Sequence, residues 1–408
     1  MIRIGALLVS ICLAAGCAAG RSTLGTREET PYPLAAKPQP DEIRHVPTGL
    51  PLSIEGAIDI LSGARLVCIG ETHDNLHAHR VQLIVLRELE RRAPGRVALG
   101  MEMFREPQQE ALDRWTRGEL SEIEFLKASK WYDNWGSDFG YYRDILNFAR
   151  ENRVDIVALN PARELQEAVS RTGLDNVSGE LRGKLPEIGP PDPWQRAVLK
   201  GIFGGHLPTE GMFDSFLQVQ SLWEETMASR IVDYLRSTRG SGKTMVILTG
   251  GWHVKYGFGI PKKVLRRMPM PYAILLTDEI EIPEEKKDQL MDVDLPDIPL
   301  LPADLIWYVP YEDLEGTRMR LGVRIADHGG RVIVERVEEG SPADKAGIPD
   351  GCEIVSFDGR PVEDTVDLFY RIGEKREGDV GIVVYRKDGV ESKAAVTFFR
   401  TPRKGPHR

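Results

Sequence analysis

Two histidines follow strand-like apolar runs at the same spacing from a glycine. The run that begins at residue 64 leads into Gly70-Glu71-Thr72-His73, and the run that begins at residue 243 leads into Gly250-Gly251-Trp252-His253. Short apolar runs that are rich in β-branched residues and end at glycine are typical of buried parallel strands. Ligands of open α/β sheets bind outside the carboxyl ends of such strands, so we expect both histidines at one site.

Two further runs bring polar side chains to the same predicted edge. The run over 96–101 leads to Glu102, and the run over 154–159 leads to Asn160. Two imidazoles and a carboxylate can hold a divalent transition metal with one position open for water, while a second carboxylate acts as general base. The candidate metal ligands are therefore His73, His253, Glu71 and Glu102, and the two glutamates are also the candidate catalytic residues of a hydrolase.

Two predicted helices direct further polar side chains to this edge. Asp74 is expected to cap a helix on which Asn75, His79 and Gln82 recur at helical spacing, and we expect that stripe to face inward. In the second helix, the apolar stripe over 213–231 contains Gln220 as its one polar member, which needs a partner if it is buried. The candidate site-lining residues are His79, Gln82, Asn160 and Gln220.

The elements that position these residues predict an α/β fold. Strand-like runs alternate with two long, largely helical segments, 104–150 and 162–240, which predicts a mainly parallel sheet flanked by helices with long helical insertions. The glycine-rich stretch 201–206 is predicted to be a mobile loop that carries His206. Lys262-Lys263 together with Arg266-Arg267 is predicted to be a solvated helix end.

The N-terminus has the pattern of an export signal. A short basic start is followed by an apolar stretch over 4–15, which is too short to span a membrane and is typical of a signal peptide. The stretch ends in Leu13-Ala14-Ala15-Gly16-Cys17, which resembles the lipobox of bacterial lipoproteins, with residues 1–16 as the signal peptide and Cys17 as the lipidated residue. Residues 17–45 are expected to be a flexible tether. The expected location is the cell envelope, lipid-anchored at the outer membrane and facing the periplasm or the surface.

The net charge limits the kinds of partner, and the composition predicts how the chain is divided into domains. The net charge of −9 over 408 residues argues against nucleic-acid binding, because no basic face is available for phosphates. A large α/β domain is predicted over 46–280. An acidic, proline-rich linker is predicted over 281–314, and a small β-rich domain over 315–400.

The C-terminal domain resembles a bacterial PDZ domain. The resemblance rests on the run from Gly340 to Gly359, which includes Ser341-Pro342-Ala343, Ala346-Gly347 and Asp358-Gly359. It implies a small β-sandwich or barrel that binds an extended peptide or protein C-terminus by adding a strand to a sheet edge. The matching carboxylate-binding turn is Leu321-Gly322-Val323, and the helix of the groove is expected to begin near Val362.

The large domain resembles the ChaN/Tiki superfamily, and in particular its bacterial ChaN-like haem-binding lipoproteins. The matching residues are Gly70–His73 with His79 and Gln82, Glu102, Gln220 with Trp223 and Met227, and Gly250–His253 with the segment up to Pro261. The resemblance implies an α/β fold, a lipoprotein and, in some members, haem held between two protomers. More distant Tiki relatives are metal-dependent proteases that use Gly-x-x-His motifs and a glutamate.

Three functions follow from these observations. The first is haem binding for iron uptake or handling, with a PDZ domain that recruits a partner. The haem would be non-covalent, because the chain has no Cys-x-x-Cys-His attachment motif. The axial ligand of the iron is not identifiable from the sequence. A metal-dependent peptidase or hydrolase is the second, and a non-catalytic envelope scaffold is the third. A homodimer is a further expectation from the resemblance.

Overall fold

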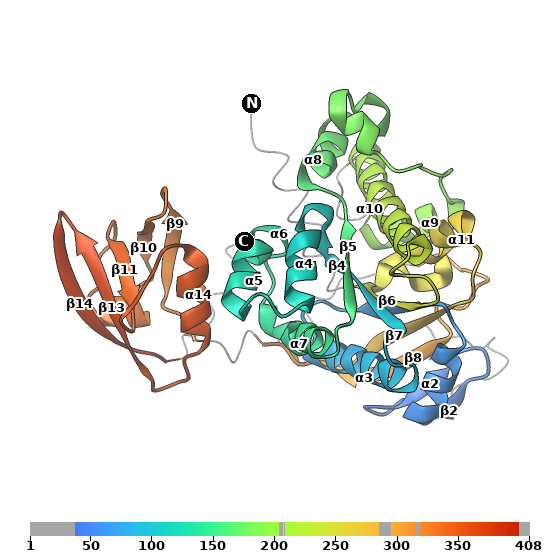
Figure 1. Ribbon diagram of the computed structural model, residues 1–408, viewed down its shortest axis with the longest axis horizontal. Coiled ribbons are helices and arrows are strands. Elements are labelled where there is room, and N and C mark those ends of the chain that lie inside the picture. Colours follow the sequence, from blue (N-terminus) through green and yellow to red (C-terminus); the bar gives the residue numbers. More distant parts are fainter. Residues whose placement is uncertain (1–36, 204–206, 208, 285–294, 315–318, 400–408) are drawn as a thin grey trace. The chain divides into compact units, whose positions relative to one another are not determined.

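The computed structural model describes residues 37–203, 207, 209–284, 295–314 and 319–399 (Figure 1). The chain divides into two compact units, the first with residues up to 120 and from 128 to 313, the second with residues 121–127 and from 314 onward. The predicted signal peptide, Cys17 and His206 lie outside the described residues. No helix within the described part is long and apolar enough to span a membrane.

The first unit is built on an eight-stranded, mostly parallel sheet with the order β2-β1-β8-β7-β3-β6-β4-β5. All neighbouring pairs from β8 to β5 are parallel, and β1 and β2 form an antiparallel hairpin at one edge. The strands are β1 (Ile43–His45), β2 (Leu50–Leu52), β3 (Leu66–Glu71), β4 (Val97–Arg105), β5 (Asp155–Asn160), β6 (Thr244–Gly250), β7 (Tyr272–Glu281) and β8 (Leu305–Pro310).

Helices connect the strands and cover the sheet (Figure 1). The longest is α10, which contains the predicted stripe with Gln220. These helices are α2 (Ile54–Ser62), α3 (Leu76–Arg92), α4 (Gln109–Thr116), α6 (Trp131–Asn134), α7 (Arg143–Glu151), α8 (Arg163–Thr172), α9 (Pro193–Phe203), α10 (Glu210–Arg236) and α11 (Ile260–Arg267); α5 (Glu122–Ala128) belongs to the second unit except for its last residue. Short 3₁₀ segments are present at Glu106–Gln108, Phe139–Tyr141, Leu174–Asn176, Gly179–Lys184, Gly251–His253 and Lys255–Gly257.

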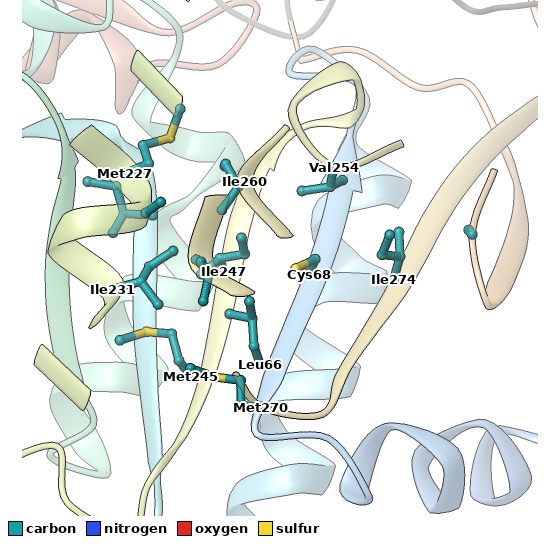
Figure 2. Packing of buried hydrophobic residues seen from close by; sticks show 14 of the residues in the cluster. Leu66, Cys68, Met227, Ile231, Met245, Ile247, Val254, Ile260, Met270 and Ile274 are labelled. Atoms are coloured by element: carbon teal, nitrogen blue, oxygen red, sulfur yellow. The ribbon is translucent and has the colours of Figure 1, made fainter. Parts of the chain in front are cut away.

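The core of the first unit lies between the sheet and helices α10 and α11. Figure 2 shows Cys68 and Ile247 on adjacent strands facing Ile231 of α10 and Ile260 of α11. Because side chains alternate along a strand, Val67 and its equivalents point to the opposite face, where they are also buried. Burial on both faces explains why these strands are continuous apolar runs, as the sequence predicts for a parallel sheet.

Two predicted boundaries differ from the structure. The linker predicted over 281–314 includes residues 305–310, which form β8 and pair with β7 inside the sheet. The apolar run Leu305–Val309 is fully buried there, and this burial outweighs the proline-rich composition of its surroundings. Similarly, residues 43–45 were assigned to the tether, and they form β1 against β8.

The second unit contains an antiparallel sheet with the order β14-β13-β11-β10-β9, with β12 paired to β11. Its core includes Leu321, Phe357 and Phe398. The elements are β9 (Val323–Asp327), β10 (Val332–Val337), α13 (Pro342–Lys345), β11 (Glu353–Phe357), β12 (Arg360–Pro361), α14 (Thr365–Gly373), β13 (Val380–Lys387) and β14 (Val390–Thr397). Helix α14 begins three residues after Val362, because Asp364 caps it by accepting from the backbone N–H of Asp367.

Candidate functional site

The carboxyl ends of four adjacent parallel strands bring the predicted residues together. Glu71 at the end of β3 is in register with Gly250 at the end of β6, and Glu102 and Asn160 lie on the next two strands. The two Gly-x-x-His segments touch, since a Cβ on Gly70 would lie 2.9 Å from the Cα of Gly251. Glycine at position 70 therefore permits the approach that places both histidines at one edge.

Glu71 is the acceptor at the centre of the first half of the site. Its Oε1 accepts from Nδ1 of His73 at 2.7 Å and from the hydroxyl of Tyr142 at 2.6 Å, and its Oε2 accepts from the side-chain amide of Gln82. Burial alone would raise the pKa of Glu71, but the positive charge of His79 and the bonds from His73 and Tyr142 lower this pKa to about 2. Glu71 is therefore a carboxylate that orients His73.

His79 completes this half from helix α3. Its Nδ1 lies 3.1 Å from the side-chain oxygen of Gln82, and its Nε2 lies 3.0 Å from the backbone oxygen of His73. The buried stripe of the helix faces the site, as the spacing predicts. The cap differs from the prediction: Asn75, rather than Asp74, accepts from the backbone N–H of His77.

His253 is held between two carboxylates in the second half of the site. Its Nε2 lies 3.4 Å from Oε1 of Glu102, and its Nδ1 lies 3.3 Å from Oε1 of Glu224. Burial lowers the pKa of His253, but the charges and hydrogen bonds of Glu102 and Glu224 outweigh it and raise this pKa to about 10. The two carboxylates therefore favour the protonated form of His253, whose Nδ1 also lies 3.0 Å from the side-chain amide nitrogen of Gln220.

Glu224 is itself held by three side chains from helices α9 to α11. Its Oε2 accepts from Nζ of Lys263 and from the amide of Gln195, each at 2.7 Å, and its Oε1 accepts from the amide of Gln220 at 2.8 Å. Burial opposes ionisation, but Lys263 is the largest influence that lowers the pKa of Glu224, which falls to about 2. The prediction of a solvated helix end at 262–267 is wrong for Lys263, which is buried against this carboxylate.

His73 keeps one ring nitrogen available. Because a carboxylate only accepts, Nδ1–H of His73 donates to Glu71, and within the described part of the chain no hydrogen bond engages its Nε2. A Cβ on Gly250 would lie 3.2 Å from this Nε2 and 3.8 Å from Oε2 of Glu102. Glycine at position 250 therefore lets an imidazole nitrogen and a carboxylate oxygen approach the end of β6 closely, and the backbone N–H of Gly250 donates to that Oε2 at 2.8 Å.

Aromatic rings contact both histidines. Trp135 meets the ring of His73 edge-on, with ring centroids 4.8 Å apart, and Trp223 meets the ring of His253 edge-on at 6.2 Å. An imidazole with Nδ1 held by a carboxylate can present Nε2 to a metal ion or to haem iron, or can take a proton from a bound molecule.

The structure brings together Glu71, His73, His79, Gln82, Glu102, Asn160, Gln220 and His253, all of which the sequence predicts at this edge. It does not assemble the predicted metal centre: the described residues contain no group of three or more His, Cys, Asp or Glu side chains placed to hold a metal ion. Glu71 and Glu102 point to imidazole N–H groups instead of sharing a centre with the imidazoles.

Sequence reasoning missed Tyr142, Glu224 and Lys263. Glu224 lies one helical turn after Gln220, so the demand of a buried glutamine for partners was a usable signal. Tyr142 belongs to an aromatic-rich segment in which no single ring stands out, so no local pattern identifies it.

The predicted peptide-binding turn of the second unit lies beside the sheet edge. Strand β9 is the terminal strand of its sheet, and residues 321–323 lead into it. Gly322 has a φ of +76°, and its backbone oxygen accepts from the N–H of Glu338 at 2.9 Å. These contacts fix the turn at the start of the open edge.

A profile of the family described as "Haem-binding uptake, Tiki superfamily, ChaN" matches residues 57–264, about half of the chain. The chain belongs to this family. A second profile, described as a PDZ domain, matches residues 319–398, so a ChaN-like haem-binding domain is joined to a PDZ domain. The search of curated proteins gave no match.

Among solved structures, one is similar to the first unit in fold and others match the C-terminal region with low scores. "Cofacial heme binding to ChaN of Campylobacter jejuni" is 17% identical, with 66% of this chain and 96% of that chain covered and a TM-score of 0.51, a likeness that shows the fold. The "HtrA3 PDZ Domain Bound to a Phage-Derived Ligand (FGRWV)" is 19% identical over 20% of this chain and 86% of that chain, with a TM-score of 0.19. A serine endoprotease from Yersinia pestis is 23% identical over 20% of this chain and 29% of that chain, with a TM-score of 0.19.

Proposed function

We propose that this protein binds haem in its ChaN-like domain, with Nε2 of His73 as the axial ligand of the iron. The observation that carries the proposal is the His73–Glu71 pair, in which a buried carboxylate holds Nδ1 while Nε2, beside Gly250, makes no hydrogen bond with any described residue. Histidines that ligate metals commonly donate their other N–H to a carboxylate in this way. Bound haem would supply an iron centre for storage or transfer.

The surroundings of His73 fit a flat, mostly apolar ligand. Trp135 packs edge-on against His73, Trp223 packs edge-on against His253, and Gly250 adds no side chain between the two histidines. The metal-dependent hydrolase has less support, because the carboxylates expected to join the imidazoles as ligands hold them through hydrogen bonds.

The setting of this haem site is a lipid-anchored envelope protein. We propose that Cys17 carries the lipid, that residues after it tether the domains to the outer membrane, and that the protein takes part in iron uptake or handling as a homodimer. The PDZ domain would add the C-terminus of a partner protein as a strand beside β9, with its terminal carboxylate at Leu321-Gly322-Val323.

Titration of the purified full chain with haem tests the central claim. A saturable Soret band is expected for the wild type, and His73→Ala should weaken binding and move the band to that of a different ligand set. His77→Ala is the matched control, since His77 lies on α3, partly exposed, and pairs with Glu312.

Two results would contradict the proposal. If His73→Ala gave an unchanged Soret maximum and affinity, the iron ligand would lie elsewhere. If the wild type bound no haem and elemental analysis found stoichiometric zinc, manganese or cobalt that His73→Ala removed, the hydrolase alternative would take its place.

A further inference from the structure

Two arginines lie opposite each other on neighbouring strands of the second unit. Arg324 of the terminal strand β9 is in register with Arg336 of β10, and both side chains are exposed. Residues that are directly opposite in an antiparallel pair project from the same face of the sheet, and like charges in such a pair repel each other. The two guanidinium groups therefore concentrate positive charge at the open edge of this sheet.

A bulge in β10 produces this pairing. The ladder pairs Val334 with Ile325 and then skips Glu335 before Arg336 meets Arg324. An uninterrupted ladder would have placed Glu335 opposite Arg324, which would have been a favourable pair of opposite charges. Bulges near a sheet edge often re-aim a side chain next to a functional site. The second unit thus has a like-charged pair where the sequence could have supplied an ion pair.

Neither arginine has a counter-ion in the described part of the chain. No ion pair or side-chain hydrogen bond joins either guanidinium to a described carboxylate, and this includes Glu335 as well as Glu338 and Glu339 beyond the end of β10. At the far end of β9, Asp327 accepts from the backbone N–H of Gly330 at 2.9 Å. The positive charge of the pair is therefore available to an anion from outside the chain.

The alternation of side chains along β9 determines which residue of a bound peptide would meet Arg324. Val323 and Ile325 pack against the core of the unit, and the exposed Arg324 between them lies on the opposite face. A peptide whose terminal carboxylate lies at residues 321–323 must run antiparallel to β9. With its last residue opposite Val323, its penultimate residue lies opposite Arg324 and projects from the same face as the arginine.

We propose that Arg324 and Arg336 select partner C-termini that have an acidic penultimate residue. This inference rests on the peptide binding proposed for the PDZ domain, and it names the chemistry of the partner. The carboxylate of the penultimate residue would lie on the open side of Arg324, while Arg336 lies on the other side. An anion in that position offsets the repulsion between the two guanidinium groups, and the planar fork of an arginine can donate two parallel hydrogen bonds to it.

Fluorescence titration of the full chain with three synthetic hexapeptides tests the proposal. The peptides all end in valine and differ only in the penultimate residue, which is glutamate, glutamine or lysine. The wild type should bind the glutamate peptide about threefold more tightly than the glutamine peptide, and the lysine peptide most weakly, because exposed charge pairs are modest. The preference should shrink at about 1 M salt, where the Debye length is about 3 Å.

Substitutions at the two strands give the sharper test. Arg324→Glu should reverse the order, so that the lysine peptide binds more tightly than the glutamate peptide. Arg336→Gln should keep the order and reduce the preference for glutamate, because one of the two positive charges is lost. Arg331→Gln is the matched control, since Arg331 is exposed in the turn between β9 and β10 and should leave all three affinities unchanged.

The outcomes separate this inference from the proposed function. Equal affinities of the wild type for all three peptides would overturn the selection of acidic residues and leave peptide binding intact. Equal losses for all three peptides in Arg324→Glu would also overturn it, because they indicate a structural role for the arginine. A wild type that binds none of the peptides would overturn the peptide binding proposed for the PDZ domain together with this inference.

Discussion

Lys263 of α11 donates to Glu224 of α10 across 2.7 Å, and both side chains are buried. Glu224 in turn contacts His253, so the carboxylate that holds this histidine is itself held by a lysine from α11. Gln195 and Gln220 satisfy the remaining acceptor positions of the Glu224 carboxylate. Buried charges are stable only when they are paired and hydrogen-bonded. This series of contacts therefore couples the orientation of His253 to the packing of α9, α10 and α11.

Removal of the lysine should therefore destabilise the first unit strongly. Lys263→Met leaves the buried Glu224 without its ammonium partner, and breaking one partner of such a pair costs about 3–5 kcal/mol. Urea denaturation measures the loss. The neighbouring Lys262 is exposed and pairs with Asp192, so Lys262→Met should cost less than about 1 kcal/mol. Similar losses for both variants would show that the buried pair is unimportant.

The stability of the first unit should fall at both low pH and high pH, giving an acid limb and an alkaline limb. Glu71 and Glu224 have pKa values lowered from 4.5 to about 2, so the stability they contribute is present above pH 4.5 and is lost as the pH falls toward 2. His253 has a pKa raised from 6.5 to about 10, so its contribution is complete below pH 6.5 and is lost as the pH rises through 10.

Urea midpoints measured from pH 3 to pH 10 check both limbs, with the maximum expected between about pH 5 and 6.5. His253→Gln should flatten the alkaline limb, while His77→Gln, on the partly exposed side of α3, should leave it in place. An alkaline limb that survives in His253→Gln would contradict the assignment.

Gly250→Ala should block the ligand without unfolding the protein. The backbone at Gly250 has φ −55° and ψ 139°, which alanine adopts readily, but the added methyl group would lie 3.2 Å from Nε2 of His73. Haem affinity should fall at least about tenfold in a Soret titration, with little change in the melting temperature. Gly183→Ala, where a Cβ meets nothing within 4 Å, is the control. Unchanged haem affinity would place the ligand away from Gly250.

The turn before β9 offers a test confined to the PDZ domain. In Gly322→Ala the new Cβ would lie 2.1 Å from Cβ of Ser341 in a left-handed backbone, so we expect a loss of about 3 kcal/mol and of C-terminal peptide binding. Gly329 has a similar φ of +67° with nothing within 4 Å, so Gly329→Ala should cost only about 1 kcal/mol. Calorimetry and peptide titration by fluorescence would separate the two; equal losses would mean that the overlap at Ser341 is unimportant.

The strand ends were predictable because local signals agree there. Apolar β-branched runs that stop at Gly70 and Gly250 predict buried parallel strands, and the parallel arrangement then places Glu71, His73 and His253 at one edge. The burial of His79 and Gln82 followed from their spacing on α3.

The partners of these residues were less predictable, because they depend on tertiary packing. Lys263 has the composition of an exposed helix end, and only the position of Glu224 across the interface buries it. Strand β8 was missed for a similar reason: its six residues follow a proline-rich stretch, and their place in the sheet depends on β7 and β1. Such pairings between distant segments leave no periodicity in the sequence.

The order of strands in the sheet also sets when the site can exist. Strands β3 and β4 are consecutive in the chain, but β6, which begins more than 130 residues after β4 starts, lies between them. During synthesis, a chain that has not yet reached β6 contains Glu71 on β3 and Glu102 on β4. It still lacks the strand that lies between β3 and β4, and it lacks His253. Pairings of such long sequence separation form late in folding. We therefore expect the residues at this edge to come together only in chains that have been synthesised through β6 and His253.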